Sequence, residues 1–218
     1  MGDVMKHPYI PEELQLPGYV PIFFTRAYIV GVYAAASSLL VLFTWILSGR
    51  CSKITTINRV LMCWWAFTGL THIILEGYFV FSPDFYKLKS PVYLAEVWKE
   101  YSKGDSRYVA RDSAVVTVEG ITAVLVGPAS LLAVYAIGAR KPYSHLIQFA
   151  ASLSQLYGDV VYFVTAYLEG DNFSASGHYY WTYYVLANSF WVVIPMFIAV
   201  SCWKKITRAF SSEKTKKI

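Results

Sequence analysis

Five long apolar blocks constrain the fold of this chain more than any other feature. They cover residues 27–48, 60–81, 114–138, 145–168 and 180–203. Each block approaches the roughly 20 residues with which a helix crosses the hydrocarbon core of a bilayer. Hydrophobic residues make up 56% of the 218 residues and charged residues only 15%, which is too little polar surface for a soluble domain. The sequence therefore predicts an all-α integral membrane protein, built as a five-transmembrane-helix bundle.

The predicted organisation is a single membrane domain with three polar additions. These are an N-terminal arm (1–26), the membrane domain (27–203) with a long loop (82–113), and a basic C-terminal tail (204–218). The arm is polar and Pro-rich, without the basic start and apolar run of a signal peptide. The fourth block is the weakest span because it contains Gln155 and Asp159, and an interfacial or re-entrant helix is the alternative there.

The net charge of +5 is concentrated near the C-terminus, and the cysteines form no motif. Beside a membrane span, a basic tail is expected to face anionic lipid, so no nucleic-acid partner is predicted. Cys51, Cys63 and Cys202 suggest neither a disulfide framework nor a metal site.

The distribution of Lys and Arg predicts the orientation. The tail and the first and third loops carry basic residues and share one side, which favours a cytosolic C-terminus. The ending KTKKI (214–218) resembles a cytosolic dilysine signal for return to the endoplasmic reticulum. Asn172-Phe-Ser174, a glycosylation acceptor pattern, lies on the opposite side. We therefore expect a multi-pass protein of the endoplasmic reticulum membrane.

Polar residues within the spans come in pairs at helical spacing. The pairs are His72 with Glu76, Glu119 with Thr122, and Asn188 with Trp191. Residues three or four positions apart lie on one face of a helix, and all these pairs lie in the half of the bundle next to the loop. Ionisable groups within membrane spans are costly and usually functional. The pairs therefore predict a shared polar pocket inside the bundle.

Interhelical hydrogen bonding is the alternative explanation for such polar residues. It stays open for Gln155, Asp159 and Thr122. It is disfavoured for His72 and the two glutamates, because two carboxylates and an imidazole exceed what packing requires. Such groups in an apolar pocket can give and take protons near neutral pH. There is no Gly-rich phosphate loop, no metal-ligand spacing and no paired Cys, so the sequence predicts proton transfer on a lipid with no cofactor and no metal.

Five stretches carry a resemblance to a known family. They are HIILEGYFV (72–80), WKEYSKGDSRY (98–108), VEGITAVLVGPAS (118–130), QLYGDVVYF (155–163) and ANSFWVVIP (187–195). Together they resemble the emopamil-binding protein family of sterol Delta-8, Delta-7 isomerases, in a plant-like form. Gly120 follows Glu119 where the animal relatives have a bulkier Thr, which leaves sterol preference undecided.

The resemblance implies a five-helix fold in the endoplasmic reticulum and a sterol isomerase of sterol biosynthesis. It also implies a set of residues associated with activity: His72, Glu76, Tyr101, Asp105, Arg107, Tyr108, Glu119, Thr122, Asn188 and Trp191. In the implied reaction an acid protonates carbon 9, a cation forms at carbon 8, and a base removes a proton from carbon 7.

Our hypothesis from the sequence gives each residue a role. The His72–Glu76 pair supplies the proton and Glu119, oriented by Thr122, receives the other, although these roles are open to exchange. Trp191 faces the cation through its π face, and Asn188, on the same helix face, fixes the position of this polar pair.

The long loop is expected to form a lid. Asp105 and Arg107 would pin it together with Glu100 or Lys99, and Tyr101 and Tyr108 would touch the substrate or hold the lid. The alternative is a solvated charged loop.

The expected partners are a sterol substrate, the lipid bilayer and cationic amphiphilic amines, which would mimic the carbocation and inhibit the enzyme. A homodimer stays open. A competing hypothesis is a non-catalytic sterol or amine-binding protein of the same fold. A channel or transporter is disfavoured because its polar stripes would cross both leaflets, whereas these stop at mid-depth.

Overall fold

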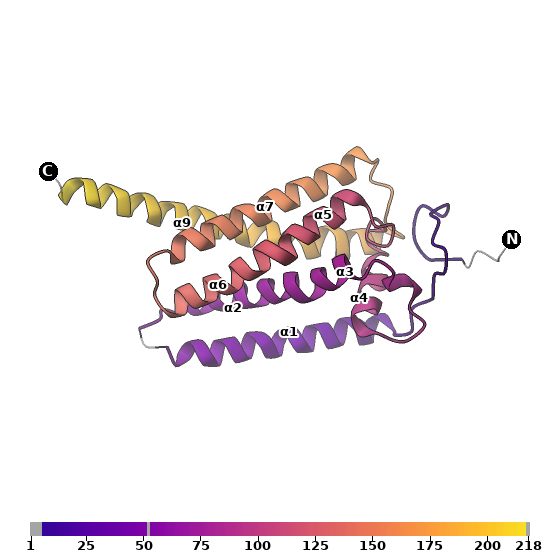
Figure 1. Cartoon of the computed structure of the whole chain (residues 1–218), viewed down its shortest axis with the longest axis horizontal. Coiled ribbons are helices and arrows are strands. Elements are labelled where there is room, and N and C mark those ends of the chain that lie inside the picture. Colours follow the sequence, from indigo (N-terminus) through magenta and orange to yellow (C-terminus); the bar gives the residue numbers. More distant parts are fainter. Residues whose placement is uncertain (1–5, 52, 217–218) are drawn as a thin grey trace.

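The computed structural model describes residues 6–51 and 53–216, and it contains helices and connecting segments but no strand over those residues. The first five residues of the predicted arm and the last two of the predicted tail lie outside the described residues. Long helices lie side by side in an elongated bundle, with α4 near one end and α9 extending beyond the other (Figure 1). The all-α prediction is confirmed.

Four helices are long and apolar enough to cross a membrane. They cover Arg26–Gly49, Thr56–Phe81, Ser113–Gly138 and Gly177–Ser211. Their outward side chains are apolar, as those of Leu39, Phe43 and Phe197 show, each at least 60% exposed. Helix α7 (Ser144–Leu168) has 25 residues but does not meet the same apolarity, because polar residues such as Gln148 and Gln155 interrupt it. The chain is a multi-pass membrane protein with four spans of this kind among the described residues.

Three of these long helices contain a π-helical segment. η1 (Thr71–Glu76) joins α2 (Thr56–Leu70) to α3 (Gly77–Phe81), η3 (Thr122–Val126) joins α5 (Ser113–Ile121) to α6 (Gly127–Gly138), and η4 (Tyr180–Ala187) joins α8 (Gly177–Tyr179) to α9 (Asn188–Lys216). A π-helical turn widens the helix locally and occurs frequently at functional sites. η1 packs against η3, so the widened turns of two spans face each other.

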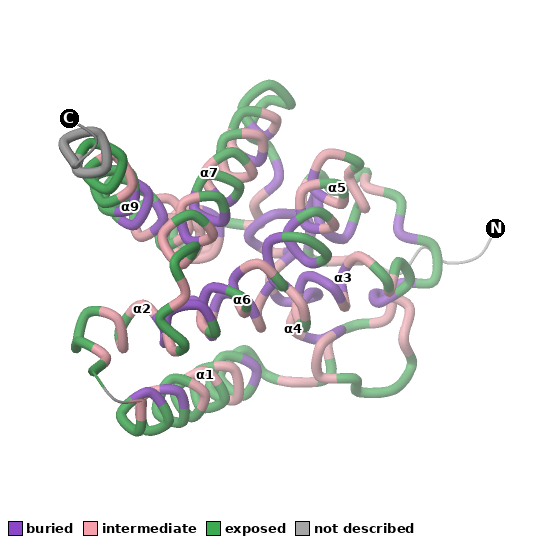
Figure 2. The backbone as a smooth tube through the Cα atoms, turned by 60° about the vertical axis from the view of Figure 1, so that its left-hand side comes forward, coloured by how far each residue is buried: buried purple, intermediate pink, exposed green. Residues whose placement is uncertain are grey.

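Small residues let the spans approach closely below these turns. A Cβ atom on Gly127 would lie 2.6 Å from Cγ1 of Ile73 and 3.1 Å from the carbonyl oxygen of Gly69. Such close contact between backbones is a usual way for membrane helices to pack. The α1 helix (Arg26–Gly49) packs on α2 and is largely exposed, whereas buried residues face the middle of the bundle (Figure 2).

The segment 82–113, expected as a loop, is partly helical. It contains η2 (Phe85–Lys87) and α4 (Tyr93–Tyr101). Trp98 and Tyr101 face the bundle, while Glu96 and Lys99 form a fully buried ion pair at 2.9 Å on the other face. The arm buries that pair, because the backbone N–H of Phe24 donates to the Glu96 carboxylate at 3.3 Å.

The described parts of the two chain ends are more ordered than the arm and the tail expected from the sequence. In the N-terminal arm, the hydroxyl of Tyr9 donates to the backbone oxygen of Lys99 at 3.1 Å, so the arm packs on α4. At the other end, α9 continues to Lys216, and the basic segment expected as a tail is therefore helical.

Candidate active site

A cavity of about 600 Å³ lies within the bundle and is lined from α1, α2, η1, α4, α5, η3, α7, η4 and α9. Eight of the ten residues predicted from the sequence line it: His72, Glu76, Tyr101, Tyr108, Glu119, Thr122, Asn188 and Trp191. Asp105 and Arg107 lie outside the lining. The remaining walls are largely apolar, which suits a lipid with few polar groups.

The His72–Glu76 pair lies on η1 and is buried. Nδ1 of His72 is 2.7 Å from each carboxylate oxygen of Glu76. The predicted pairing of these residues is therefore present, although it occurs on a π-helical turn rather than on the expected α-helix.

Thr68 and Gln155 hold the far side of the imidazole. Nε2 of His72 lies 2.9 Å from the Gln155 amide nitrogen and 3.2 Å from the Thr68 hydroxyl. Trp191 donates its indole N–H to the same Thr68 oxygen at 2.8 Å. Because the Gln155 nitrogen can only donate, Nε2 accepts and the Nδ1 proton faces Glu76. Sequence reasoning missed Thr68, whose only signal is its position one turn before His72.

Thr122 contacts Glu76, not the Glu119 carboxyl that it was expected to orient. Its hydroxyl donates to the Glu76 carboxylate. The expectation was wrong because Thr122 begins η3, which packs on η1 and so turns the hydroxyl towards Glu76. The Glu119 carboxyl instead accepts a hydrogen bond from the hydroxyl of Tyr108.

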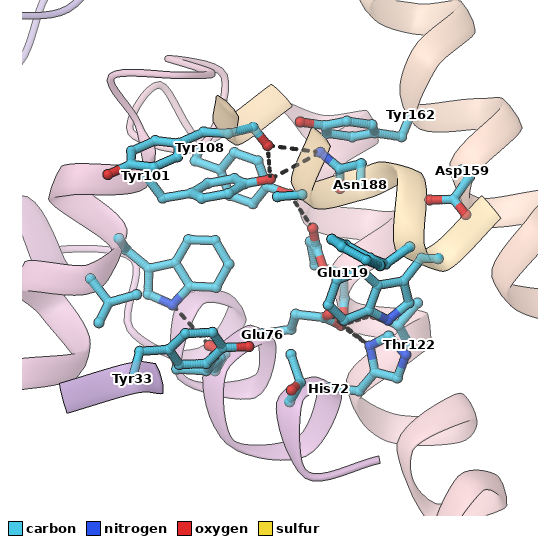
Figure 3. Close-up of a pocket in the computed structure, with 18 of the residues that line it drawn as sticks. Tyr33, His72, Glu76, Tyr101, Tyr108, Glu119, Thr122, Asp159, Tyr162 and Asn188 are labelled. Atoms are coloured by element: carbon cyan, nitrogen blue, oxygen red, sulfur yellow. Dashed lines mark hydrogen bonds and ion pairs between the residues drawn. The ribbon is translucent and has the colours of Figure 1, made fainter. Parts of the chain in front are cut away.

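Two tyrosines and Asn188 form a layer next to Glu119 (Figure 3). Asn188 donates to the Tyr101 hydroxyl at 3.0 Å, and the rings of Tyr101 and Tyr108 meet edge to face at 5.0 Å. Burial raises the pKa of both phenols. Both hydroxyls therefore stay protonated, and Tyr108 serves Glu119 as a donor.

Asp105 and Arg107 pin the segment after α4 to α7. They pair with each other at 2.7 Å, and the Tyr162 hydroxyl donates to Asp105 at 2.6 Å. Burial opposes the charge of Arg107, but hydrogen bonds from its guanidinium to Asp105 raise its pKa above the ordinary value. The expected pinning by Glu100 or Lys99 is wrong, because those side chains pair with Lys103 and Glu96 instead.

Two further residues that line the cavity were not predicted as site residues. Tyr33 reaches the cavity from α1, and Asp159 from α7. Oδ2 of Asp159 is buried and has no hydrogen-bond partner within the described part of the chain. Its signal in the sequence is its position one turn after Gln155. Tyr33 has no such signal in the sequence, because a single tyrosine in an apolar span is usually a packing residue.

The cavity opens sideways between α1 and the η4–α9 segment. Val30, Leu186 and Phe190 line the cavity and are 46%, 56% and 51% exposed. These side chains are apolar and lie in helices long and apolar enough to cross a membrane.

Comparisons with known proteins match the same region. Residues 93–202 match the family model described as "EBP: EXPERA (EXPanded EBP superfamily)". A "Probable 3-beta-hydroxysteroid-Delta(8),Delta(7)-isomerase" of Oryza sativa subsp. japonica is 61% identical over 99% of each chain. The protein of that name from Arabidopsis thaliana is 61% identical over 94% of this chain and 91% of its own. A protoglabretal synthase of Ailanthus altissima is 49% identical over 97% of each.

Proposed function

This chain belongs to the EXPERA family, the EXPanded EBP superfamily, and we propose that it works without a cofactor, by moving protons within the cavity. It is a sterol Delta(8),Delta(7)-isomerase. One observation carries the proposal. Two carboxyl groups and an imidazole meet inside an apolar cavity of about 600 Å³. Proton donors and acceptors in such a site fit the shift of a carbon–carbon double bond.

The proposed reaction has two proton transfers. An acid adds a proton to carbon 9 of the 8,9 double bond, which leaves a tertiary cation at carbon 8. A base then removes a proton from carbon 7, and the electrons of that C–H bond form the 7,8 double bond. One proton enters and one leaves, so the sterol keeps its composition.

The hydrogen bonds favour Glu119 as the acid and Glu76 with His72 as the base. Glu76 receives hydrogen bonds from His72 and Thr122, and donors of this kind stabilise a carboxylate. Glu119 accepts from the Tyr108 hydroxyl and has fewer donors than Glu76, so we assign the proton to Glu119. Carbon 7 lies next to a cation, so its proton is acidic and a weak base suffices. The sequence hypothesis gave the two groups the opposite roles, with the His72–Glu76 pair as donor and Glu119 as acceptor, and left their exchange open.

Trp191 and its aromatic neighbours are proposed to stabilise the cation. The Trp191 ring lies 6.4 Å from the His72 ring and 5.9 Å from that of Trp64, and all three line the cavity. The face of an indole ring attracts a positive charge, and the attraction strengthens where water is excluded. A lipophilic molecule with a protonated amine would occupy the same place and inhibit the enzyme.

We further propose that α7 is the fifth span and that the protein resides in the endoplasmic reticulum with a cytosolic C-terminus. The length of α7 and its packing against α9 support the first proposal. The basic residues of the tail support the orientation. Reporter tags placed after Gly49 and after Gly170 would then be accessible from opposite sides of the membrane.

The 3-beta-hydroxysteroid named for the relatives from rice and Arabidopsis is the proposed substrate class. The Ailanthus relative carries a different name at 49% identity, so side chains around the cavity are expected to tune which ring system is accepted.

Expression in cells that lack their own isomerase tests the function. Mass spectrometry of the sterols should show accumulated Delta-8 sterol converted to Delta-7 sterol when this chain is present. Unchanged Delta-8 sterol, with the protein folded in the membrane, would reject the proposal.

A further inference from the structure

The cavity contains a second polar cluster, away from the groups assigned to proton transfer. It consists of Glu100 on α4 and Tyr183 on η4, both of which line the cavity. The Tyr183 hydroxyl donates to Oε1 of Glu100 at 3.2 Å, and Lys103 binds Oε2 at 2.6 Å. Glu100 is only 2% exposed. Its charge is paired with Lys103, and its carboxylate faces a largely apolar cavity, where it can accept a further hydrogen bond.

Contacts between aromatic rings connect this cluster to the reacting groups. Tyr108, which binds Glu119, contacts the ring of Tyr101 at 5.0 Å, and Tyr101 stacks on Tyr183 at 5.9 Å. Two ring contacts therefore separate the tyrosine bound to Glu119 from the tyrosine bound to Glu100. Both clusters line one cavity, so an extended ring system can contact both.

We propose that Glu100 and Tyr183 bind the 3β-hydroxyl of the substrate and thereby set its register against Glu119 and Glu76. This inference rests on the proposed function and adds the contact that orients the substrate. The sterol hydroxyl donates to the Glu100 carboxylate, whose oxygens have lone pairs left after the bonds to Lys103 and Tyr183.

The surroundings of the cluster fit this orientation. The side chain of Lys103 is 20% exposed, so the cluster lies close to the surface of the molecule. A sterol in a bilayer also keeps its hydroxyl towards water and its rings in hydrocarbon. A molecule that enters through the side opening would therefore meet the cluster with its hydroxyl end already at the right depth.

Substrate analogues separate this contact from the chemistry. We would compare a Delta-8 sterol with a free 3β-hydroxyl against its 3-methyl ether, which cannot donate a hydrogen bond. The wild-type protein should prefer the free hydroxyl by about tenfold or more in kcat/KM, because a site built for a hydroxyl rejects the analogue that lacks it. Glu100→Gln and Tyr183→Phe should shrink that preference, mainly by raising KM for the hydroxylated sterol.

Tyr179→Phe is the matched control. Tyr179 stands one turn before Tyr183 and contacts its ring at 5.4 Å, but it does not line the cavity. This variant should keep the wild-type preference. Tyr183→Phe keeps the ring on Tyr101, so it tests the contact even if Glu100→Gln fails to fold.

Two results would overturn the inference. Either the wild-type protein handles both sterols equally, or Tyr183→Phe lowers kcat/KM for both by the same factor. A wild-type protein that is folded yet converts neither sterol would instead reject the proposed isomerase, and this inference with it.

Discussion

Hydrogen-bond donors distinguish the two glutamates of the cavity. Glu76 accepts from the His72 ring and the Thr122 hydroxyl, whereas the protein donor to Glu119 is the Tyr108 hydroxyl. A carboxyl surrounded by donors favours its charged form, so the proton is assigned to Glu119, which has fewer donors. The assignment of acid and base therefore rests on the His72 ring and the Thr122 hydroxyl, which both face Glu76.

Replacement of Thr122 tests that assignment. Thr122→Val keeps the shape of the side chain but removes a hydrogen bond to a charged group, worth about 1.5–3 kcal/mol. Steady-state turnover should fall roughly 10- to 100-fold. Thr122→Ser keeps the hydroxyl and should retain most of the activity. Equal activity of the Val and Ser variants would show that the hydroxyl does not support Glu76.

Among the helical elements, α4 and the segment after it close the end of the cavity. Trp98 and Tyr101 of α4 and Tyr108 after it line the cavity, and the Asp105–Arg107 pair fixes this segment to α7 through Tyr162. Asp105 is fully buried. Removal of one partner of a buried ion pair leaves the other charge unpaired, which costs more than the pair contributes when intact.

Asp105→Asn should therefore destabilise the protein. We expect a loss of about 3–5 kcal/mol in the free energy of unfolding, with activity lost at growth temperature. Thermal unfolding in detergent micelles would measure the change. Asp84→Asn is the control, since it removes an exposed ion pair with Lys87 on the same segment and should leave the unfolding midpoint unchanged. Similar midpoints for the two variants would argue against a fixed segment.

The sequence predicted some elements of this region and missed others for physical reasons. Helical spacing identified His72 with Glu76, because it reports which side chains share a face. It does not report the hydrogen-bond register of the backbone, so the π-helical turns and the contact of Thr122 with Glu76 were missed. Helix α4 was missed because Glu96 and Lys99 are typical of a solvated loop. In the structure, the N-terminal arm buries both.

At the scale of the whole molecule, the bundle encloses the chemistry but leaves one side open to lipid. Four helices have the length and composition of membrane spans, and three of them carry cavity residues on or beside their π-helical turns. The opening between α1 and the η4–α9 segment is lined by exposed apolar residues. A sterol dissolved in the bilayer can therefore reach the cavity without crossing water.

A bulky residue in the opening should hinder access of the substrate. Leu186→Trp is expected to raise KM several-fold, with a smaller effect on kcat, because the reacting groups stay in place. Leu132→Trp places the same side chain on the lipid-facing surface of α6, outside the cavity, and should leave both constants unchanged. Kinetics on sterol in lipid nanodiscs would compare them. If the two variants behave alike, the substrate reaches the cavity by another path.

The most direct test of the account is the conversion of Delta-8 sterol in heavy water by the wild-type protein and by Glu76→Gln and Glu119→Gln. The wild-type product should carry one deuterium at carbon 9. Each variant should stay folded and lose about 10²- to 10⁴-fold in turnover, the usual contribution of a general acid or base. A wild-type product without deuterium at carbon 9, or near-wild-type turnover in either variant, would contradict proton transfer by these two carboxyl groups.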